Sequence, residues 1–313
     1  MNRSVPASAA TEAVAAVLRA HDEGRSLELA TAGTTGAPRT IRRTTESWWA
    51  SFDAYADLTG VGPGARLWIP GPLSATMNLF AAVHAAATGG VLVDDPGSAT
   101  HACLTPTALD RHGDLLPRGA QVVVAGAALS PRLHERATSG GLVVMSYYGA
   151  AELSFVAAGP HVDDLHAFPG VDLEIRDDEI WVHSRYLAEG LGPWASVGDL
   201  GRLDGDRLVV IGRPGTATTA GATVSLAAIE AALQAHATAP IAVVALPHDG
   251  LGEVIAIALA DDDLDAVRSA ARTLLPQTHR PRNWHVVPDL PQTAAGKIDR
   301  ARLRAQLLAG STP

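Results

Sequence analysis

Between residues 66 and 147, short apolar runs alternate with longer amphipathic stretches, and this pattern constrains the fold more than any other. The stretches through 77–87 and after Pro106 and Ser130 have helical spacing. Apolar strands joined by helices form a mostly parallel sheet that is covered on both faces. The apolar runs are 66–70, 91–94, 102–104, 121–125 and 142–147. The sequence therefore predicts an α/β core, and ligands in such sheets bind beyond the carboxyl ends of the strands.

From about Phe168 the pattern changes to short apolar runs joined by tight turns. Asp177-Asp178 separates runs 171–175 and 179–183, and Asp204-Gly205 separates runs 200–203 and 207–211. Turns of this composition are typical of antiparallel hairpins. The predicted fold class is therefore α/β, with a mixed, mostly parallel sheet and added antiparallel hairpins.

The two ends of the chain contain further predicted elements. Residues 11–20 have helical spacing and precede an apolar run at 27–30, and Thr44 or Thr45 can cap a helix that ends near Gly60. Residues 214–223 are rich in glycine, threonine and alanine, which predicts a flexible connector. Beyond it, helices at 226–237 and 264–275 and strands at 241–246, 254–260 and 284–287 predict a small α+β unit.

Composition limits the classes of function. The net charge of −9 and the pI of about 5.7 argue against a nucleic-acid partner. A single cysteine, Cys103, excludes a disulfide framework and fits a reducing compartment, and its apolar neighbours predict a buried structural thiol. We expect a cytoplasmic protein without membrane association, because no leader pattern or bilayer-length apolar run is present. Histidines at 84, 101, 161 and 183 lack metal-ligand spacing.

The segment from Thr31 to Arg39 has the composition of a phosphate-binding loop. Glycines let backbone N–H groups approach an anion, hydroxyls add donors, and Arg39 offers a planar set of donors. The segment does not end in the Gly-Lys-Ser/Thr of a Walker A loop. A plain glycine- and threonine-rich turn between two strands has the same composition, so this segment by itself leaves both interpretations open.

Four later segments occur in a fixed order with this loop: 148–152, 197–201, 211–213 and 291–300. Together they resemble the adenylate-forming superfamily of acyl-CoA synthetases, peptide-synthetase adenylation domains and luciferases. The patterns of that family are a Ser/Thr-Gly-rich loop ending in Pro-Lys, then Tyr-Gly-x-Thr-Glu, Thr-Gly-Asp, Gly-Arg and Pro-x-Thr-x-x-Gly-Lys. The resemblance covers about the whole chain.

The resemblance implies that a substrate carboxylate attacks the α-phosphate of ATP, which releases pyrophosphate and leaves an acyl-AMP. A thiol, usually that of coenzyme A, then accepts the acyl group. The phosphates would be held by Thr31, Gly33, Thr34, Thr35, Gly36 and Arg39. Tyr148 would stack on adenine, with Gly149 next to it in the nucleotide site, and Gly126 and Ala127 would present backbone to the base. Glu152 would hold Mg²⁺, and Asp199 would accept the ribose hydroxyls beside Arg213. Lys297 would bridge the carboxylate and the α-phosphate.

Simpler roles remain open for these residues. Asp199 next to glycines also fits the start of a turn, Lys297 also fits a solvated loop, and Glu152 also fits a strand end. By resemblance, residues 1–212 form an adenylating core that lacks the usual first subdomain, and residues 213–313 form a mobile lid. The edge that such a missing subdomain leaves could be covered in a homodimer.

Several positions depart from the family pattern. Arg39 replaces a lysine, Ala32 replaces a hydroxyl, and Ala151 replaces the threonine before Glu152. After Arg213, the acidic hinge residue and the lysine of the family are replaced by Gly215, Thr216 and Thr219. The changes after Arg213 affect the lid rotation on which the thioester step depends. Together with Ala32 and Ala151, they keep open a homologue that binds a nucleotide or acyl-adenylate without turnover.

Among shortened relatives, the chain most resembles actinobacterial o-succinylbenzoate:CoA ligases. Those enzymes have a Pro-Pro-Tyr-His type segment where this chain has Pro70-Gly71-Pro72-Leu73-Ser74, without the histidine. Trp48, Trp49, Met77 and Phe80 fit either an acyl pocket or core packing. The predicted function is an ATP-dependent ligase that activates a small carboxylic acid for coenzyme A. The enzymatic alternative transfers the acyl group to a carrier protein or an amine.

Overall fold

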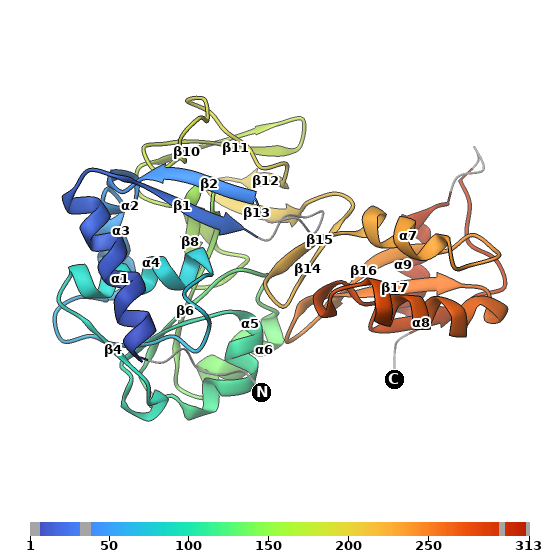
Figure 1. Ribbon diagram of the computed structural model, residues 1–313, viewed down its shortest axis with the longest axis horizontal. Helices are drawn as coiled ribbons and strands as arrows, with labels where there is room; N and C mark the ends of the chain where they lie inside the picture. The colour runs from blue at the N-terminus through green and yellow to red at the C-terminus, as the bar shows by residue number, and fades with distance from the viewer. Residues whose placement is uncertain (1–6, 32–38, 294–297, 311–313) are drawn as a thin grey trace. The chain divides into compact units, whose positions relative to one another are not determined.

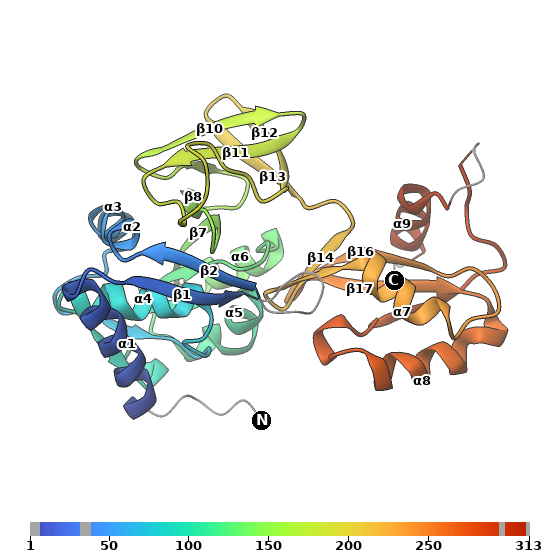
Figure 2. The ribbon, with the colours of Figure 1, turned by 45° about the horizontal axis from the view of Figure 1, so that its top comes forward.

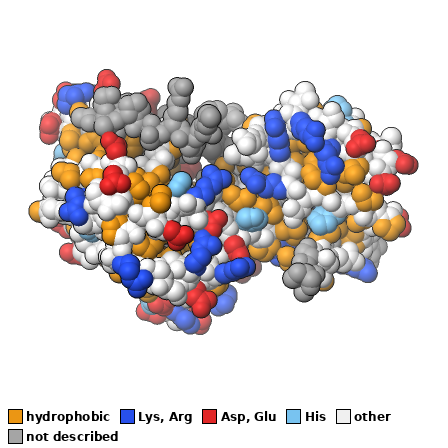
Figure 3. Space-filling model, turned by 90° about the horizontal axis from the view of Figure 1, so that it is seen from below, with side chains coloured by type: hydrophobic (Ala, Val, Ile, Leu, Met, Phe, Trp, Pro, Cys, Tyr) orange, Lys and Arg blue, Asp and Glu red, His pale blue; other side chains and the backbone are white. Residues whose placement is uncertain are grey.

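The computed structural model describes residues 7–31, 39–293 and 298–310. Its contacts divide the chain into two compact units, a larger one that runs to Pro214 and a smaller one that begins at Gly215 (Figure 1). None of the helices in the described ranges is long and apolar enough to cross a bilayer. Acidic and basic side chains are interspersed on the face drawn in Figure 3.

The larger unit is built on a mixed sheet of eleven strands in the order β10-β11-β12-β13-β9-β8-β7-β6-β5-β3-β4. The parallel part consists of β3 (Arg66–Trp68), β4 (Val91–Val93), β5 (His101–Leu104), β6 (Gln121–Val124) and β7 (Val143–Ala150). The antiparallel part consists of β8 (Ser154–Gly159), β9 (Leu165–Ala167), β10 (Val171–Arg176), β11 (Glu179–Ser184), β12 (Leu200–Asp204) and β13 (Arg207–Gly212). The predicted fold class is confirmed.

Helices cover both faces of the parallel strands because successive side chains point to opposite faces. Leu104, Val122 and Val124 pack with one helical layer, whereas Cys103 and Val123 contribute to the clusters on the opposite face. Figure 1 shows these layers on either side of the strands. The first layer contains α5 (Pro106–His112) and α6 (Pro131–Ser139), and the second contains α1 (Ala7–Asp22), α2 (Glu46–Trp49), α3 (Phe52–Thr59) and α4 (Thr76–Ala87).

A separate hairpin, β1 (Ser26–Thr31) and β2 (Arg39–Thr44), lies beside α4 (Figures 1 and 2). Leu27 and Leu29 on its inward face are buried in the same core cluster as α1 and α4. The strand predicted at 27–30 is therefore confirmed. The loop between the two strands lies outside the described residues.

In the smaller unit, β16 (Ala242–His248) and β17 (Gly252–Leu259) are buried on both faces. Alternate residues such as Val243 and Ile257 pack against α7 (Leu226–Gln234) and α8 (Leu264–Leu274), whereas Val244 and Ala256 pack against α9 (Arg300–Ala309). β18 (Asn283–Val286) extends the sheet parallel to β17. The small α+β unit predicted from the sequence is present, and α9 adds a helix that the sequence did not indicate.

The predicted flexible connector at 214–223 is wrong. It contains β14 (Thr216–Thr219), which forms an antiparallel hairpin with β15 (Ala222–Ser225). The turn places Ala220 at a φ of 51° and Gly221 at 83°. The sequence did not indicate these strands because their side chains are small. Ala217 and Val224 become fully buried only when the smaller sheet assembles around them.

The single helix predicted to end near Gly60 is two helices. α2 ends at Trp49 and α3 begins at Phe52. Between them, Ser51 has a φ of −97° and its hydroxyl donates to the Trp48 carbonyl at 2.7 Å. The predicted stop is confirmed, since Gly60 ends α3 with a φ of 69°. Strands β8 and β9 were not anticipated from the sequence.

Aromatic side chains from α2, α3 and α4 form the centre of the larger core. Trp48 and Phe80 are buried and pack edge to face with ring centroids 5.4 Å apart, which supports core packing over an acyl pocket for these two residues. His84 is also fully buried, and its Nε2 lies 3.1 Å from the Phe52 carbonyl oxygen. Burial lowers the pKa of His84 to about 4, although that hydrogen bond acts in the opposite direction.

This buried histidine predicts a loss of stability in mild acid. An unfolded histidine takes up a proton below a pH of about 6.5, whereas the folded one resists until a pH of about 4, so the free energy of unfolding falls by about 1.4 kcal/mol per pH unit in between. We expect His84→Gln to reduce the stability difference between pH 7 and pH 5 by about 2 kcal/mol, measured by urea unfolding. The exposed His236, changed to Gln, serves as the control. An H84Q protein with the wild-type pH dependence would contradict this account.

Candidate active site

Three of the predicted site residues, Tyr148, Asp199 and Arg213, come together in the larger unit. Tyr148 lies on β7, Asp199 directly precedes β12, and Arg213 directly follows β13. Because Leu200 pairs with Gly212 across the β12–β13 hairpin, Asp199 and Arg213 meet at its open end. Long-range pairing thus joins residues from three separate sequence segments.

The carboxylate of Asp199 is the centre of this group. Its Oδ1 accepts from Arg213 Nε at 3.0 Å, and its Oδ2 accepts from the Tyr148 hydroxyl at 2.8 Å. The side chains of Asp199 and Arg213 are 17% and 30% exposed, so the pair is partly shielded yet reachable from solvent. An ionised carboxylate has about four acceptor positions, and two therefore remain for hydroxyl donors of a ligand.

Tyr148 is a fixed donor in this arrangement. Burial raises the pKa of its hydroxyl strongly, and the neighbouring Asp199 charge raises it further. The hydroxyl therefore stays protonated and directs its proton to Asp199 Oδ2. This bond leaves the aromatic ring half-buried at the core cluster of the larger unit.

Glycines around Asp199 allow the backbone to take this path. Gly198 has a φ of 81°, in the left-handed region that side chains rarely adopt, and its N–H donates to Ser196 Oγ at 3.1 Å. A Cβ on Gly201 would lie 2.8 Å from the Val209 carbonyl oxygen. Glycine is therefore required at 198 for the positive φ and at 201 for the close approach of a carbonyl, independently of any role of Asp199.

Gly126 and Ala127 follow β6, the strand next to β7. Since Val124 pairs with Ser146, the ends of the two parallel strands point in the same direction, toward Gly126 and Tyr148. Gly126 is exposed and has a φ of 85°. Gly149 lies at a bulge, where an added Cβ would come within 2.2 Å of the Ser154 carbonyl oxygen. A crevice at this edge of the sheet, as expected from the strand order, stays a prediction.

Glu152 lies in the turn between β7 and β8, past the strand end. It is half-buried, and its backbone carbonyl accepts from Ala188 N at 2.8 Å. Among the described residues, its carboxylate has no hydrogen bond or ion pair. An acceptor-only carboxylate of this kind suits Mg²⁺, which binds proteins through one or two carboxylates together with substrate phosphates.

Most of the predicted phosphate loop lies outside the described residues. The residues that the structure does not describe include Ala32, Gly33, Thr34, Thr35 and Gly36 of the loop, and also Lys297. Thr31 ends β1 and Arg39 begins β2, and their backbones pair with each other. The hairpin therefore fixes the two points from which the loop starts and returns.

Arg43 is a charged residue near the site that the sequence analysis missed. It is fully buried on β2, and its Nη2 donates to the Tyr186 carbonyl at 2.8 Å. The available signal was strand alternation, because Ile41 and Arg43 share the inward face of the hairpin with Leu27 and Leu29. A cation at such a position is unusual and points to an electrostatic role.

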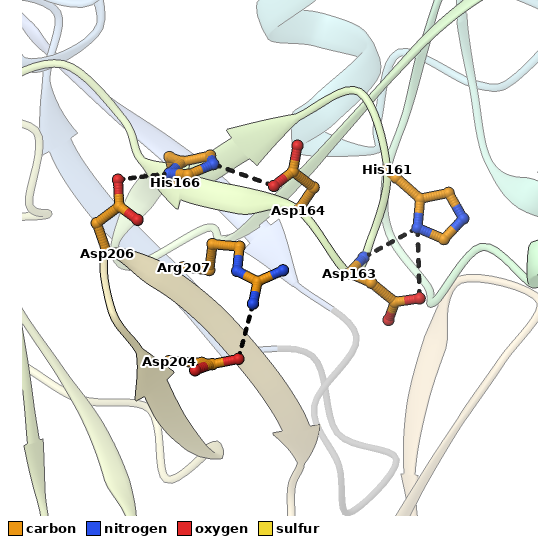
Figure 4. Close-up of polar contacts among 7 residues, drawn as sticks. All are labelled: His161, Asp163, Asp164, His166, Asp204, Asp206 and Arg207. Atoms are coloured by element: carbon orange, nitrogen blue, oxygen red, sulfur yellow. Dashed lines mark hydrogen bonds and ion pairs between the residues drawn. The ribbon is translucent and has the colours of Figure 1, made fainter.

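Histidines and carboxylates also gather outside this site, as Figure 4 shows. His166 lies between Asp164 and Asp206, each 3.2 Å from one ring nitrogen, and His161 lies 3.4 Å from an oxygen of Asp163. Within the described ranges, no three acidic, histidine or cysteine side chains are arranged to hold a metal ion. These contacts are surface ion pairs when the histidines are protonated.

Cys103 agrees with its predicted role. It is a free thiol, 2% exposed, on β5, the middle strand of the parallel part of the sheet. Burial raises its pKa to about 12, so the nucleophilic thiolate is disfavoured. The residue acts as a small apolar side chain in the core.

The chain is similar to several known proteins. Residues 228–297 match the AMP-binding enzyme C-terminal domain. A probable 2-succinylbenzoate–CoA ligase of Mycobacterium tuberculosis is 30% identical over 90% of this chain and 84% of its own length. The amide bond synthetase McbA of Marinactinospora thermotolerans has a TM-score of 0.75 and 28% identity, over 91% of this chain and 69% of that one. An o-succinylbenzoate CoA synthetase of Bacillus subtilis, at 20% identity and a TM-score of 0.72, shares the fold over 89% and 69% of the two chains.

The Asp199 geometry yields a test of nucleotide binding. We expect Asp199→Asn to weaken ATP binding at least about tenfold in calorimetry, because the neutral amide loses charge-assisted bonds worth about 1.5–3 kcal/mol each. Asp204→Asn is a matched control, since Asp204 forms an exposed ion pair with Arg207 on the same hairpin (Figure 4). An unchanged ATP affinity in a folded D199N protein would show that Asp199 is only a turn residue.

Proposed function

The chain belongs to the adenylate-forming superfamily of AMP-binding enzymes, which includes 2-succinylbenzoate–CoA ligases, and on that premise we propose that it activates a carboxylic acid with ATP as an acyl-AMP. The observation that carries this proposal is the Asp199 carboxylate held by Tyr148 and Arg213. A fixed carboxylate with spare acceptor positions suits the vicinal hydroxyls of a ribose. The acyl group then passes to coenzyme A as a thioester.

The chemistry requires two anions to meet while negative charge develops on the departing pyrophosphate. Backbone donors and Arg39 of the loop would hold the phosphates, and Glu152 would hold Mg²⁺, which neutralises phosphate charge when bound. Tyr148 and Arg213 orient Asp199 before the nucleotide arrives, so no rearrangement of that carboxylate is required. Gly126 and Ala127 would present backbone groups to the base.

Lys297 supports catalysis rather than binding alone. It is the only lysine in the sequence, and the other 23 of the 24 Lys and Arg residues are arginines. A chain that uses arginine for every other cation retains lysine where the resemblance puts the residue that bridges the carboxylate and the α-phosphate. Lysine offers a compact charge on a flexible stem, which the planar guanidinium does not reproduce.

The acceptor of the acyl group has a second candidate. Similarity to an amide bond synthetase favours an amine, and a carrier-protein thiol is a further option. Coenzyme A is favoured by the ligase named among the relatives. Gly215, with a φ of 69°, stands where the family has its hinge, so a rotation there would depend on glycine flexibility. We place the enzyme in the cytoplasm, in keeping with its single buried thiol.

The function is tested by ATP–pyrophosphate exchange against a panel of aromatic and aliphatic carboxylic acids. We expect exchange with at least one acid, and thioester formation when coenzyme A is added. Amide formation with added amines, in the absence of a thioester, would favour the second candidate. Silence across the panel, with ATP still raising the melting temperature, would favour a homologue that binds the nucleotide without turnover.

Lys297 gives the sharpest mutational test. We expect both Lys297→Ala and Lys297→Arg to lower adenylation, the first at least about a hundredfold, and to leave ATP affinity within about twofold. The reason is that the lysine acts mainly in the transition state. The matched control is Arg302→Ala, which removes a cation on the exposed side of α9. Full activity in K297A would remove the central catalytic assignment.

A further inference from the structure

Arg43 occupies a position where the fold calls for an apolar side chain. It pairs with Leu27 across the β1–β2 hairpin, on the face that also carries Leu29 and Ile41. Its relative exposure is 0%, the same as that of the most deeply buried aliphatic residues. Burial of a guanidinium costs several kcal/mol unless nearby groups compensate its charge.

The compensation visible around Arg43 is incomplete. Nη2 donates to the Tyr186 carbonyl, and the guanidinium carbon lies 5.9 Å from the centre of the Trp48 ring. In the described part of the chain, the buried Nε and Nη1 have no hydrogen-bond partner. A neutral carbonyl and a distant ring do not balance a full charge, so the counter-charge must come from elsewhere.

The segment 186–189 connects Arg43 to the Glu152 turn. Tyr186 accepts the Arg43 hydrogen bond, and two residues later Ala188 N donates to the Glu152 carbonyl at 2.8 Å. Glu189 N then donates to the Arg42 carbonyl at 2.8 Å. Residues 186–189 therefore bond to the β2 strand, which carries Arg43, and to the β7–β8 turn, which carries Glu152.

Arg43 and Glu152 also interact through their charges. Burial lowers the pKa of Arg43 to about 10, and the negative charge of Glu152 acts in the opposite direction. At this pKa Arg43 stays positively charged at neutral pH. The charge of Glu152 therefore acts on a buried cation that stays protonated at neutral pH.

We propose that Arg43 is a positioning residue that acts through Glu152: its buried charge holds the Glu152 turn in place and disfavours a free divalent cation there, so that the metal enters together with the nucleotide phosphates. The proposal rests on the proposed function of Glu152 as the metal-binding carboxylate. Two cations near one carboxylate repel each other, and only the added negative charge of the phosphates makes both favourable. Arg43 thus couples metal binding to ATP binding.

The test uses Mn²⁺ as the probe, with binding followed by electron paramagnetic resonance in the absence of nucleotide. We expect Arg43→Met, which is apolar and of similar length, to tighten Mn²⁺ binding at least about threefold, because a nearby positive charge is removed. Arg42→Met is the matched control: this exposed neighbour on β2 pairs with Glu189, and its loss should leave Mn²⁺ affinity within about 1.5-fold. In the Glu152→Gln background, R43M should have no further effect on Mn²⁺ binding.

Unchanged or weaker Mn²⁺ binding in a folded R43M protein would overturn the proposal, since a purely structural arginine would not tighten metal binding. If R43M does not fold, Glu152→Gln alone decides. We then expect E152Q to lower the melting temperature by several degrees, because it removes the counter-charge of a buried cation. An E152Q protein as stable as the wild type overturns the coupling.

These readouts do not require turnover, so they separate the two proposals. Mn²⁺ binding that R43M leaves unchanged removes only the role of Arg43. Absence of pyrophosphate exchange in the wild-type protein, together with Mn²⁺ binding in R43M that Glu152→Gln leaves unchanged, removes the proposed function and the metal role of Glu152 with it.

Discussion

Burial of both faces of β5 and β6 is the constraint on which the larger unit depends. Alternate side chains of these strands pack into two separate helical layers, so a slip by one residue would exchange the two sets and break the packing of both layers. This register fixes where β6 and β7 end, and hence where Gly126 and Tyr148 lie. The polar residues of the site take their positions from apolar packing several residues away.

The Asp199–Arg213 pair and the buried Arg43 differ in the free energy that burial of their charge costs. Asp199 and Arg213 are partly exposed, and each carboxylate oxygen of Asp199 has a donor, so the pair is easily maintained. Arg43 is fully buried, with one hydrogen bond and two donors that lack partners in the described residues. Such a costly cation is retained only where the surrounding structure holds it in place, and here it lies beside the turn that carries Glu152.

The chain matches the family pattern at some of the positions that the resemblance assigns to the nucleotide and departs from it at others. Ala151 removes a hydroxyl next to Glu152, and Arg39 keeps the charge of the lysine it replaces. The segment after Arg213 differs in sequence yet forms the regular β14–β15 hairpin. These features are compatible with the proposed adenylating site and do not decide between coenzyme A, a carrier protein and an amine as the acceptor of the acyl group.

The sequence by itself determined the α/β class and the hairpins at Asp177-Asp178 and Asp204-Gly205, because periodicity and short motifs are local signals. The same motifs named the candidate site residues, which stay predictions. Tertiary structure decided the rest. Strand β14 is made of small residues that gain burial only from β17 and α7, and Tyr148 meets Asp199 only through pairing between distant strands. Arg43 was missed for the same reason: its charge looks like that of a surface residue until the hairpin, the 186–189 segment and the Glu152 turn close around it.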